Sequence, residues 1–284
     1  MFKFTKFMPV ALLAAVAIGF TACGDDDDDP VGSNEGGNGA AGSEPNVENV
    51  FTGGLPASVG GAAITTNADG QVTTIKNDYT TVTFEYGSFT PNRAHNYTVL
   101  MKERDAYSST DGSDIYMELN NAGFVVYAYQ VYLDGDDPDE WTFTYDKDGH
   151  MTSLVRSEGD DKYVITWNGG NITKVNETED DGDTSDFTIA YTNAEYTSAV
   201  ANKGCIMLFD DALGIDMDEM EIAYYAGLLG KATKDLPMGY TRKDVEGGST
   251  YTENVVLHWE FNANQYPTKF WEGDDTYDAV TFAW

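Results

Sequence analysis

The sequence predicts an all-β fold, an antiparallel meander of repeated hairpins that forms one curved or barrel-like sheet. The first observation is strict alternation, as where Trp141, Phe143 and Tyr145 share one side of a segment; this pattern is typical of a half-buried strand. The second is a hairpin unit that recurs along the chain. The third is a single segment, residues 216–237, in which the apolar period changes to about 3.6. It predicts one inserted α-helix around 218–230, packed on the sheet.

The repeated unit is a turn of Asp, Asn and Gly, followed by an apolar residue, a Thr and a second apolar residue. Four good copies begin at Asn67, Asp146, Asn168 and Asn262, and weaker copies begin at Asn120 and Tyr191. The expected structural turn residues are Asp69, Gly70, Asp148, Gly149, Gly169 and Gly170. Glycine supplies the positive φ that hairpin turns require. A calcium loop is the alternative, but these turns lack EF-hand spacing. Weak calcium binding by the acidic loops stays open, and no other cofactor is expected.

Alternation places the strands along the remainder of the chain. They are expected at residues 62–66, 71–76, 79–86, 96–103, 113–119, 123–133, 140–146, 150–156, 162–168, 171–176, 186–192, 253–261, 267–272 and 278–283. The predicted helix has a capping box of Asp218 and Glu221 and a stop signal at Gly230. Its apolar side should cover the sheet, with Trp167 buried against Ile222 and Leu229. A partner-binding helix is the alternative.

The amino terminus predicts a lipoprotein. Lys3 and Lys6 precede an apolar run, and the residues "FTAC" that end at Cys23 resemble a bacterial lipobox. Residues 1–22 are therefore expected to be a signal peptide, and Cys23 to carry lipid. The run Asp25, Asp26, Asp27, Asp28 and Asp29 resembles the acidic export tag of Bacteroidetes surface lipoproteins. An ordinary signal peptide followed by an acidic linker is the alternative.

The expected domain organisation follows from composition. Residues 23–48 form an acidic, Gly-rich flexible tether that begins at the lipidated Cys, and such composition does not support a packed core. Residues 55–284 form a single β-rich repeat domain.

Charge and cysteine content exclude several classes of function. With 16 basic and 48 acidic residues, the formal net charge is −32, which repels nucleic acid and anionic lipid, so neither is an expected partner. The chain has two cysteines. If Cys23 is acylated, Cys205 has no disulfide partner and is expected to be a small buried hydrophobe. The three histidines occur singly, so a Cys-His catalytic site is not expected.

The acidic lipoprotein start, the Tyr-Asp-type hairpins and the segment "YYAGLLGKATKDLP" at residues 224–237 resemble an uncharacterised family of Bacteroidales lipoproteins. That family is a domain of unknown function with a porin-like β-fold, and the resemblance covers about residues 64–284. It implies an antiparallel meander and an outer-membrane location, and it brings no catalytic residues.

The sequence thus favours a surface-exposed outer-membrane lipoprotein that acts as a non-catalytic binding or scaffold module for a glycan or protein ligand. Its membrane partner is the outer membrane, through the N-terminal lipid. An integral outer-membrane β-barrel is the first alternative, although most expected strands are shorter than the ~9–11 residues that spanning requires. A secreted glycan hydrolase is the second, because paired carboxylates can cleave glycosides. In so acidic a chain, however, carboxylate pairs are expected by chance.

Overall fold

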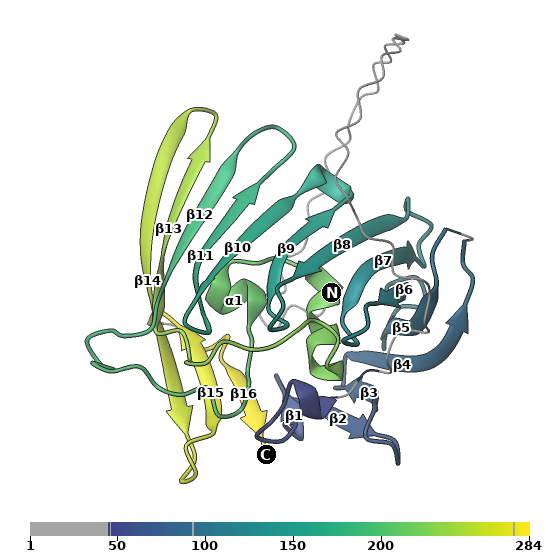
Figure 1. Cartoon of the computed structure of the whole chain (residues 1–284), viewed down its shortest axis with the longest axis horizontal. Helices are drawn as coiled ribbons and strands as arrows, with labels where there is room; N and C mark the ends of the chain where they lie inside the picture. Colours follow the sequence, from purple (N-terminus) through teal and green to yellow (C-terminus); the bar gives the residue numbers. More distant parts are fainter. Residues whose placement is uncertain (1–44, 46, 93, 275) are drawn as a thin grey trace.

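The computed structural model describes residues 45, 47–92, 94–274 and 276–284. Within them, sixteen strands form a closed barrel in which each strand pairs antiparallel with the next, and β1 closes the ring against β16 (Figure 1). The predicted meander is confirmed, and its sheet closes fully. The expected signal peptide (residues 1–22), the lipidation site Cys23 and the export tag Asp25 to Asp29 lie outside the described residues.

The barrel contains fourteen strands that overlap the predicted ones and two that the sequence did not reveal. The strands are β1 (Ser58–Val59), β2 (Ala62–Thr66), β3 (Val72–Lys76), β4 (Thr80–Phe89), β5 (Tyr97–Asp105), β6 (Ser113–Leu119), β7 (Val125–Tyr132), β8 (Asp139–Tyr145), β9 (Met151–Arg156), β10 (Lys162–Asn168), β11 (Asn171–Thr178), β12 (Thr184–Ala190), β13 (Gly239–Glu246), β14 (Ser249–Phe261), β15 (Pro267–Glu272) and β16 (Val280–Ala283). The two missed strands are β1, which has only two residues, and β13.

The barrel wall is apolar inside and polar outside. In β6, Ile115 and Met117 are buried, whereas Asp114 and Glu118 face outward and are only half-buried. The same alternation of buried and more exposed positions runs along β8 and β10. Because successive side chains of a strand point to opposite faces, the hydrophobic core of this molecule occupies the lumen of the barrel.

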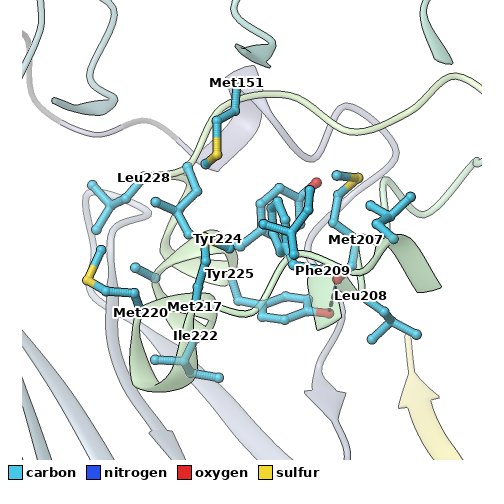
Figure 2. Packing of buried hydrophobic residues seen from close by; sticks show 14 of the residues in the cluster. Met151, Met207, Leu208, Phe209, Met217, Met220, Ile222, Tyr224, Tyr225 and Leu228 are labelled. Carbon is cyan, nitrogen blue, oxygen red and sulfur yellow. Dashed lines mark hydrogen bonds between the residues drawn. The ribbon is translucent and has the colours of Figure 1, made fainter. Parts of the chain in front are cut away.

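A long connection between β12 and β13, residues 191–238, enters that lumen and fills it with its later, buried part; we call the connection the plug. Figure 1 shows its green part within the ring of strands, where it carries α1 (Phe209–Leu213) and the 3₁₀ helix η3 (Asp218–Ala226), while its first part loops outside the strands. Residues 221–230 are all buried. They form one apolar cluster with the inner faces of the strands, and Figure 2 shows plug residues packed below Met151 of β9.

The inserted helix differs from its prediction in type, end and capping. It is a 3₁₀ helix that ends at Ala226, with Gly227 rather than Gly230 as its stop, and its N-cap, Met217, makes no side-chain capping bond. The capping-box prediction was therefore wrong. The carboxylate of Asp218 instead binds Arg156, and Glu221 Oε1 accepts a hydrogen bond from the backbone N–H of Phe209 at 3.0 Å. The two carboxylates that would cap an isolated helix therefore bind residues that are distant in the sequence or outside the helix.

Trp167 is only half-buried at the edge of the core, so the prediction that it is buried against Ile222 and Leu229 was wrong in its burial. The register of β10 against β11 shifts between Thr166 and Trp167. The alternation of β10 nevertheless continues through Trp167, whose strand partner is the buried Ile172, so the indole keeps the inward face and packs at the edge of the core. Trp167 stacks on the ring of His150, with centroids 4.2 Å apart, and its Nε1 donates to the backbone oxygen of Met151 at 2.7 Å.

Two further details differ from expectation. Cys205 is half-buried rather than buried, with a free thiol 3.7 Å from Thr52 Oγ1. The folded region also begins before Leu55, because Val47 of the 3₁₀ turn η1 (Val47–Asn49) and Phe51 are buried. The Phe51 ring stacks on Tyr225 of the plug at a centroid distance of 6.0 Å.

The simple meander gives the barrel two distinct ends. Alternate connections lie at the same end, so the connections β2–β3, β6–β7, β8–β9, β10–β11 and β14–β15 lie beside the plug, at what we call the plug end. The connections β3–β4, β5–β6, β7–β8, β9–β10, β11–β12, β13–β14 and β15–β16 form the opposite, acidic end. In Figure 1 the hairpin tips of the acidic end point upward, and η1 lies near the bottom.

Candidate functional site

Four of the repeated hairpin turns lie at the plug end and are built in the same way, whereas the copy at Asn168 is a shorter turn through Gly169 and Gly170. The side-chain Oδ1 atoms of Asn67, Asn120, Asp146 and Asn262 each accept the backbone N–H groups of the second and fourth following residues, at 2.9–3.1 Å. The third following residue has a positive φ in every case and is Gly in three of them, Gly70, Gly123 and Gly149. The copy at Asn120, weak by sequence, is therefore the same turn.

These turns also receive the plug. The backbone N–H of Lys231 donates to Gly149 O at 2.9 Å, and that of Lys234 donates to Gly170 O at 2.8 Å. Gly169 and Gly170 have φ values of 61° and 85°. At two of the turns, the side chains of Asp69 and Asp148 are exposed, and each residue donates its backbone N–H to the turn's Asx side chain. The repeat therefore builds the rim on which the plug docks.

The connections at the acidic end have a one-sided composition. Among the described residues they carry no Lys, Arg or His, and their acids are Asp78, Asp111, Asp134, Asp136, Asp137, Glu158, Asp161, Glu179, Asp180, Asp181, Asp183, Asp274 and Asp278. The plug end, in contrast, has exposed lysines at 147, 203, 231 and 234. The two ends therefore present different electrostatic potentials to a ligand.

A cleft of about 620 Å³ opens at the acidic end, and we call it the cup. It is lined by Tyr132, Asp136, Asp137, Pro138, Asp139, Arg156, Ser157, Glu158, Asp218 and Glu219. The walls come from the ends of β7, β8 and β9, and the start of η3 forms the plug's contribution. The lining carries one cationic side chain among six carboxylates.

Arg156 organises the cup by binding wall and plug together. Its guanidinium lies 2.5 Å from Asp139 Oδ2, 2.6 Å from Asp218 Oδ2 and 2.5 Å from Glu158 Oε2. Asp139 is almost completely buried, with its side chain 1% exposed. Its other oxygen accepts hydrogen bonds from the Ser157 hydroxyl and the Glu158 backbone N–H. The guanidinium carbon also lies 4.8 Å from the ring centroid of Trp141.

The charge of Arg156 is secured by these partners. Burial alone would lower its pKa, but hydrogen bonds and the charges of Asp139 and Asp218 outweigh burial and raise the pKa. Asp218 is held in the left-handed region at φ 43°, a conformation that costs a non-glycine residue about 1–3 kcal/mol. The Arg156–Asp218 contact therefore maintains a strained residue where the plug meets the wall.

A chain of polar groups leads from the cup into the lumen. Gln130 Nε2 donates to Glu219 Oε2 at 3.2 Å, and Gln130 Oε1 accepts from Trp141 Nε1 at 3.1 Å. Glu103 is 2% exposed. Burial, followed by the negative charge of Glu219, raises its pKa to about 7. Glu219, a carboxylate of the cup, is thus linked to Gln130 by a hydrogen bond and to the buried acid Glu103 by charge repulsion.

All three histidines have the same kind of environment. The Nδ1 atoms of His95, His150 and His258 lie 2.7, 3.0 and 3.1 Å from carboxylate oxygens of Glu118, Asp146 and Glu195. Each ring also stacks on an aromatic side chain, Tyr127, Trp167 or Trp271. Of the described residues, no group of three His, Cys, Asp or Glu is arranged to hold a metal ion. The weak calcium binding expected of the acidic loops stays a prediction.

Comparison with known protein families shows the family to which this barrel belongs. The family model for a domain of unknown function (DUF4595) with porin-like fold matches residues 64–269. The chain belongs to this family. The DUF4595 match agrees with a porin-like protein of known structure from Bacteroides uniformis, which has 16% identity and a TM-score of 0.54 and covers 78% of this chain and 89% of its own. A porin-like protein from Bacteroides vulgatus has 13% identity and a TM-score of 0.41, with 81% and 99% covered.

A search of curated proteins found no match. Neither the DUF4595 family nor the Bacteroides uniformis structure is described as an enzyme. Across the described residues, helices long and apolar enough to span a bilayer are absent. The porin-like fold suggests an association with the outer membrane.

The cup is the feature of the DUF4595 barrel that sequence reasoning missed. Its residues come from β7, β8, β9 and η3, which no spacing rule connects. One available signal was Arg156, a cation that ends an apolar strand in a chain with three times as many acids as bases. The cup does not resemble a glycosidase site. Three of its carboxylates bind one guanidinium, and Glu103, whose pKa is raised as a general acid requires, does not line it.

Proposed function

We propose that this chain is a lipid-anchored outer-membrane protein, displayed at the cell surface, whose sealed barrel acts as a non-catalytic binding or scaffold module. The ligand is a glycan or a protein, and the cup at the acidic end is the candidate site. The proposal combines the amino-terminal lipobox and acidic run with the polarity of the barrel. The porin-like fold suggests the outer membrane without requiring that the wall be embedded in it.

The polarity of the wall is the observation that carries the proposal. A membrane-spanning barrel needs an apolar band on its outside, but here the outward positions include Asp114 and Glu118 of β6 and Lys162 of β10. Most of the large apolar side chains instead face the lumen, where they pack on the buried plug. This arrangement supports a barrel that stands in water and contains a core rather than a channel.

The course of the chain supports an outward-facing cup. Residues 47–54 lie at the plug end, because the Tyr266 hydroxyl in the β14–β15 connection donates to Gly53 O at 2.9 Å. A tether from Cys23 would therefore reach the barrel at the plug end. The acidic end, with the cup, would be the end farther from the attachment point.

Membrane integration is tested with a chain that starts at Gly24. We expect it to remain in the supernatant after ultracentrifugation without detergent, because its outward faces are polar. The full-length protein in planar bilayers should give no conductance steps, with a general porin as positive control. Dependence of the shortened chain on detergent, or conductance, would contradict the proposal in favour of an integral barrel.

Lipidation is tested by metabolic labelling with an alkyne fatty acid. The wild-type protein and the Cys205→Ala variant should both take up label, whereas Cys23→Ala should take up none. Cys205→Ala is the matched control, because it removes the only other thiol. Label in Cys23→Ala would refute the lipobox interpretation.

Surface display is tested by protease shaving of intact cells. Replacing Asp25 to Asp29 with Ala should leave the protein anchored but protected from protease. As a matched control, replacing the loop acids Asp134, Asp136 and Asp137 with Ala should leave the protein accessible. If both variants are shaved like the wild type, the acidic run is only a linker.

A further inference from the structure

Two tyrosines at the acidic end are largely exposed and do not belong to the hydrophobic core. The residues are Tyr79 in the β3–β4 connection, 53% exposed, and Tyr107 in the β5–β6 connection, 78% exposed. Their ring centroids lie 6.1 Å apart, with the planes inclined at 51°. Large exposed aromatic side chains that cluster are typical of interaction sites rather than of packing.

Both tyrosines are held by the same backbone device. The Asn77 side-chain oxygen accepts the N–H groups of Tyr79 and Thr80, both at 2.8 Å. The Asp105 side-chain oxygen accepts those of Tyr107 and Ser108 at 2.6 and 2.8 Å. The two connections are also joined to each other, because the Ala106 N–H donates to Tyr79 O at 2.6 Å. The backbones that carry the two rings are therefore fixed relative to one another.

The surroundings of the pair are rich in hydroxyl and carboxylate groups. Ser108 Oγ lies 3.2 Å from Thr110 Oγ1, which lies 3.3 Å from Asp111 Oδ1, and Asp78 and Asp111 are exposed. These groups can donate to and accept from a polyhydroxylated ligand, while the ring faces offer it apolar contact. The acidic composition of this end disfavours anionic ligands. Exposed Lys76 precedes the first connection, which weakens the case for a cationic ligand.

We propose that Tyr79 and Tyr107 form a saccharide-binding platform that takes a neutral glycan. The apolar face of a sugar ring packs on the tyrosine rings, and its hydroxyl groups bond with Asp78, Asp111 and the Ser108–Thr110 pair. This inference rests on the proposed role of the barrel as a binding module, and it names the ligand class and a site outside the cup.

The test is affinity electrophoresis of the full-length protein in mild detergent. Native gels contain starch, mixed-linkage β-glucan or galactomannan as neutral probes, and polygalacturonate as the anionic probe. We expect retardation in at least one neutral gel and none in polygalacturonate. Changing both Tyr79→Ala and Tyr107→Ala should weaken binding to that polysaccharide at least about tenfold, whereas Tyr107→Phe, which keeps the ring, should retain it.

Tyr251→Ala is the matched control, because Tyr251 is 58% exposed but lies on β14, away from the pair. It should bind like the wild type. The absence of retardation in every neutral gel would overturn the inference, as would equal losses in Tyr251→Ala and the double variant. Binding of an oligo-arginine peptide that depends on the pair, without polysaccharide binding, would also overturn it. None of these outcomes bears on detergent-free solubility or conductance, which test the proposed function separately.

Discussion

The two ends of the barrel share one strand meander but differ in how their connections are used. At the plug end, glycine turns hold the plug through backbone hydrogen bonds, and a Cβ on plug residue Gly230 would lie 2.7 Å from Gly149 O. At the acidic end, Gly182 has nearly the same φ, 88° against 87°, yet nothing lies within 4 Å of its Cβ position. Glycines with the same backbone conformation thus allow close packing at the plug end and lie on an open surface at the acidic end.

The largest expected effect tests the ion pairs that join plug and wall at the acidic end. Arg156→Ala should lower the free energy of unfolding by about 3–5 kcal/mol, because it leaves buried Asp139 without its cation. Arg242→Ala is the control, since the Arg242 side chain is 41% exposed where it meets Asp244; it should cost about 1 kcal/mol or less. Chemical denaturation measures both. Equal small losses would mean that the Arg156 network does not bind plug to wall.

A pair of glycine variants tests the comparison directly. Gly230→Ala should cost about 2–4 kcal/mol, because positive-φ strain adds to a clash with Gly149 O and the Tyr145 ring. Gly182→Ala should cost only about 1 kcal/mol, since it meets strain alone. Denaturant melts compare the two variants with the wild type. Similar losses in both would remove the distinction between the packed and the open end.

The buried acid below the cup predicts a pH dependence. The pKa of Glu103, raised to about 7 from 4.5, means that the unfolded chain loses this proton at lower pH than the folded barrel. The free energy of unfolding should therefore fall as pH rises from about 4.5 to 7, by up to about 3 kcal/mol for this group.

Glu103→Gln should remove that part of the slope, and Glu85→Gln, an exposed acid bonded to Lys102 on the outer wall, should not. Denaturation series at pH 5 and pH 7.5 measure the difference. If Glu103→Gln follows the same pH profile as the wild type, the buried carboxyl does not control it.

The smallest effect is expected at a turn of the plug end. Asp146→Asn should change the free energy of unfolding by less than about 0.5 kcal/mol, because Asn keeps the acceptor oxygen, as Asn67 and Asn120 do in sister turns. Asp146→Ala should cost about 1 kcal/mol through loss of that acceptor. Thermal melts with and without calcium provide the check. A calcium-dependent rise in Tm that Asp146→Asn abolishes would assign the turn a metal-binding role.

Strand positions could be predicted because alternation is a local property, and the exception shows its limit. The inward positions of β13 include Arg242 and Asp244 rather than apolar residues. There the Arg242 guanidinium lies 5.5 Å from the Phe187 ring centroid, and Asp244 accepts from Ser185 at 2.7 Å. Such a strand is stabilised by residues of the neighbouring strand, and the alternation within its own segment gives no information about them. Trp167 keeps the face that alternation predicts, but the local pattern does not contain its half-burial near the end of β10.

The sequence by itself determined the meander, the faces that side chains share, the turns that need glycine and the acidic character of the chain, because these depend on neighbouring residues. Only the tertiary structure decided that the apolar face turns inward. It also decided that β1 closes on β16, that the buried part of the plug fills the lumen, and that Arg156 meets Asp139 and Asp218 in the cup. Alternation predicts that a strand has an apolar and a polar face. Which face lines the core depends on the closure of the barrel and on the plug that packs inside it. Those pairings join residues far apart in sequence, where no local period carries information.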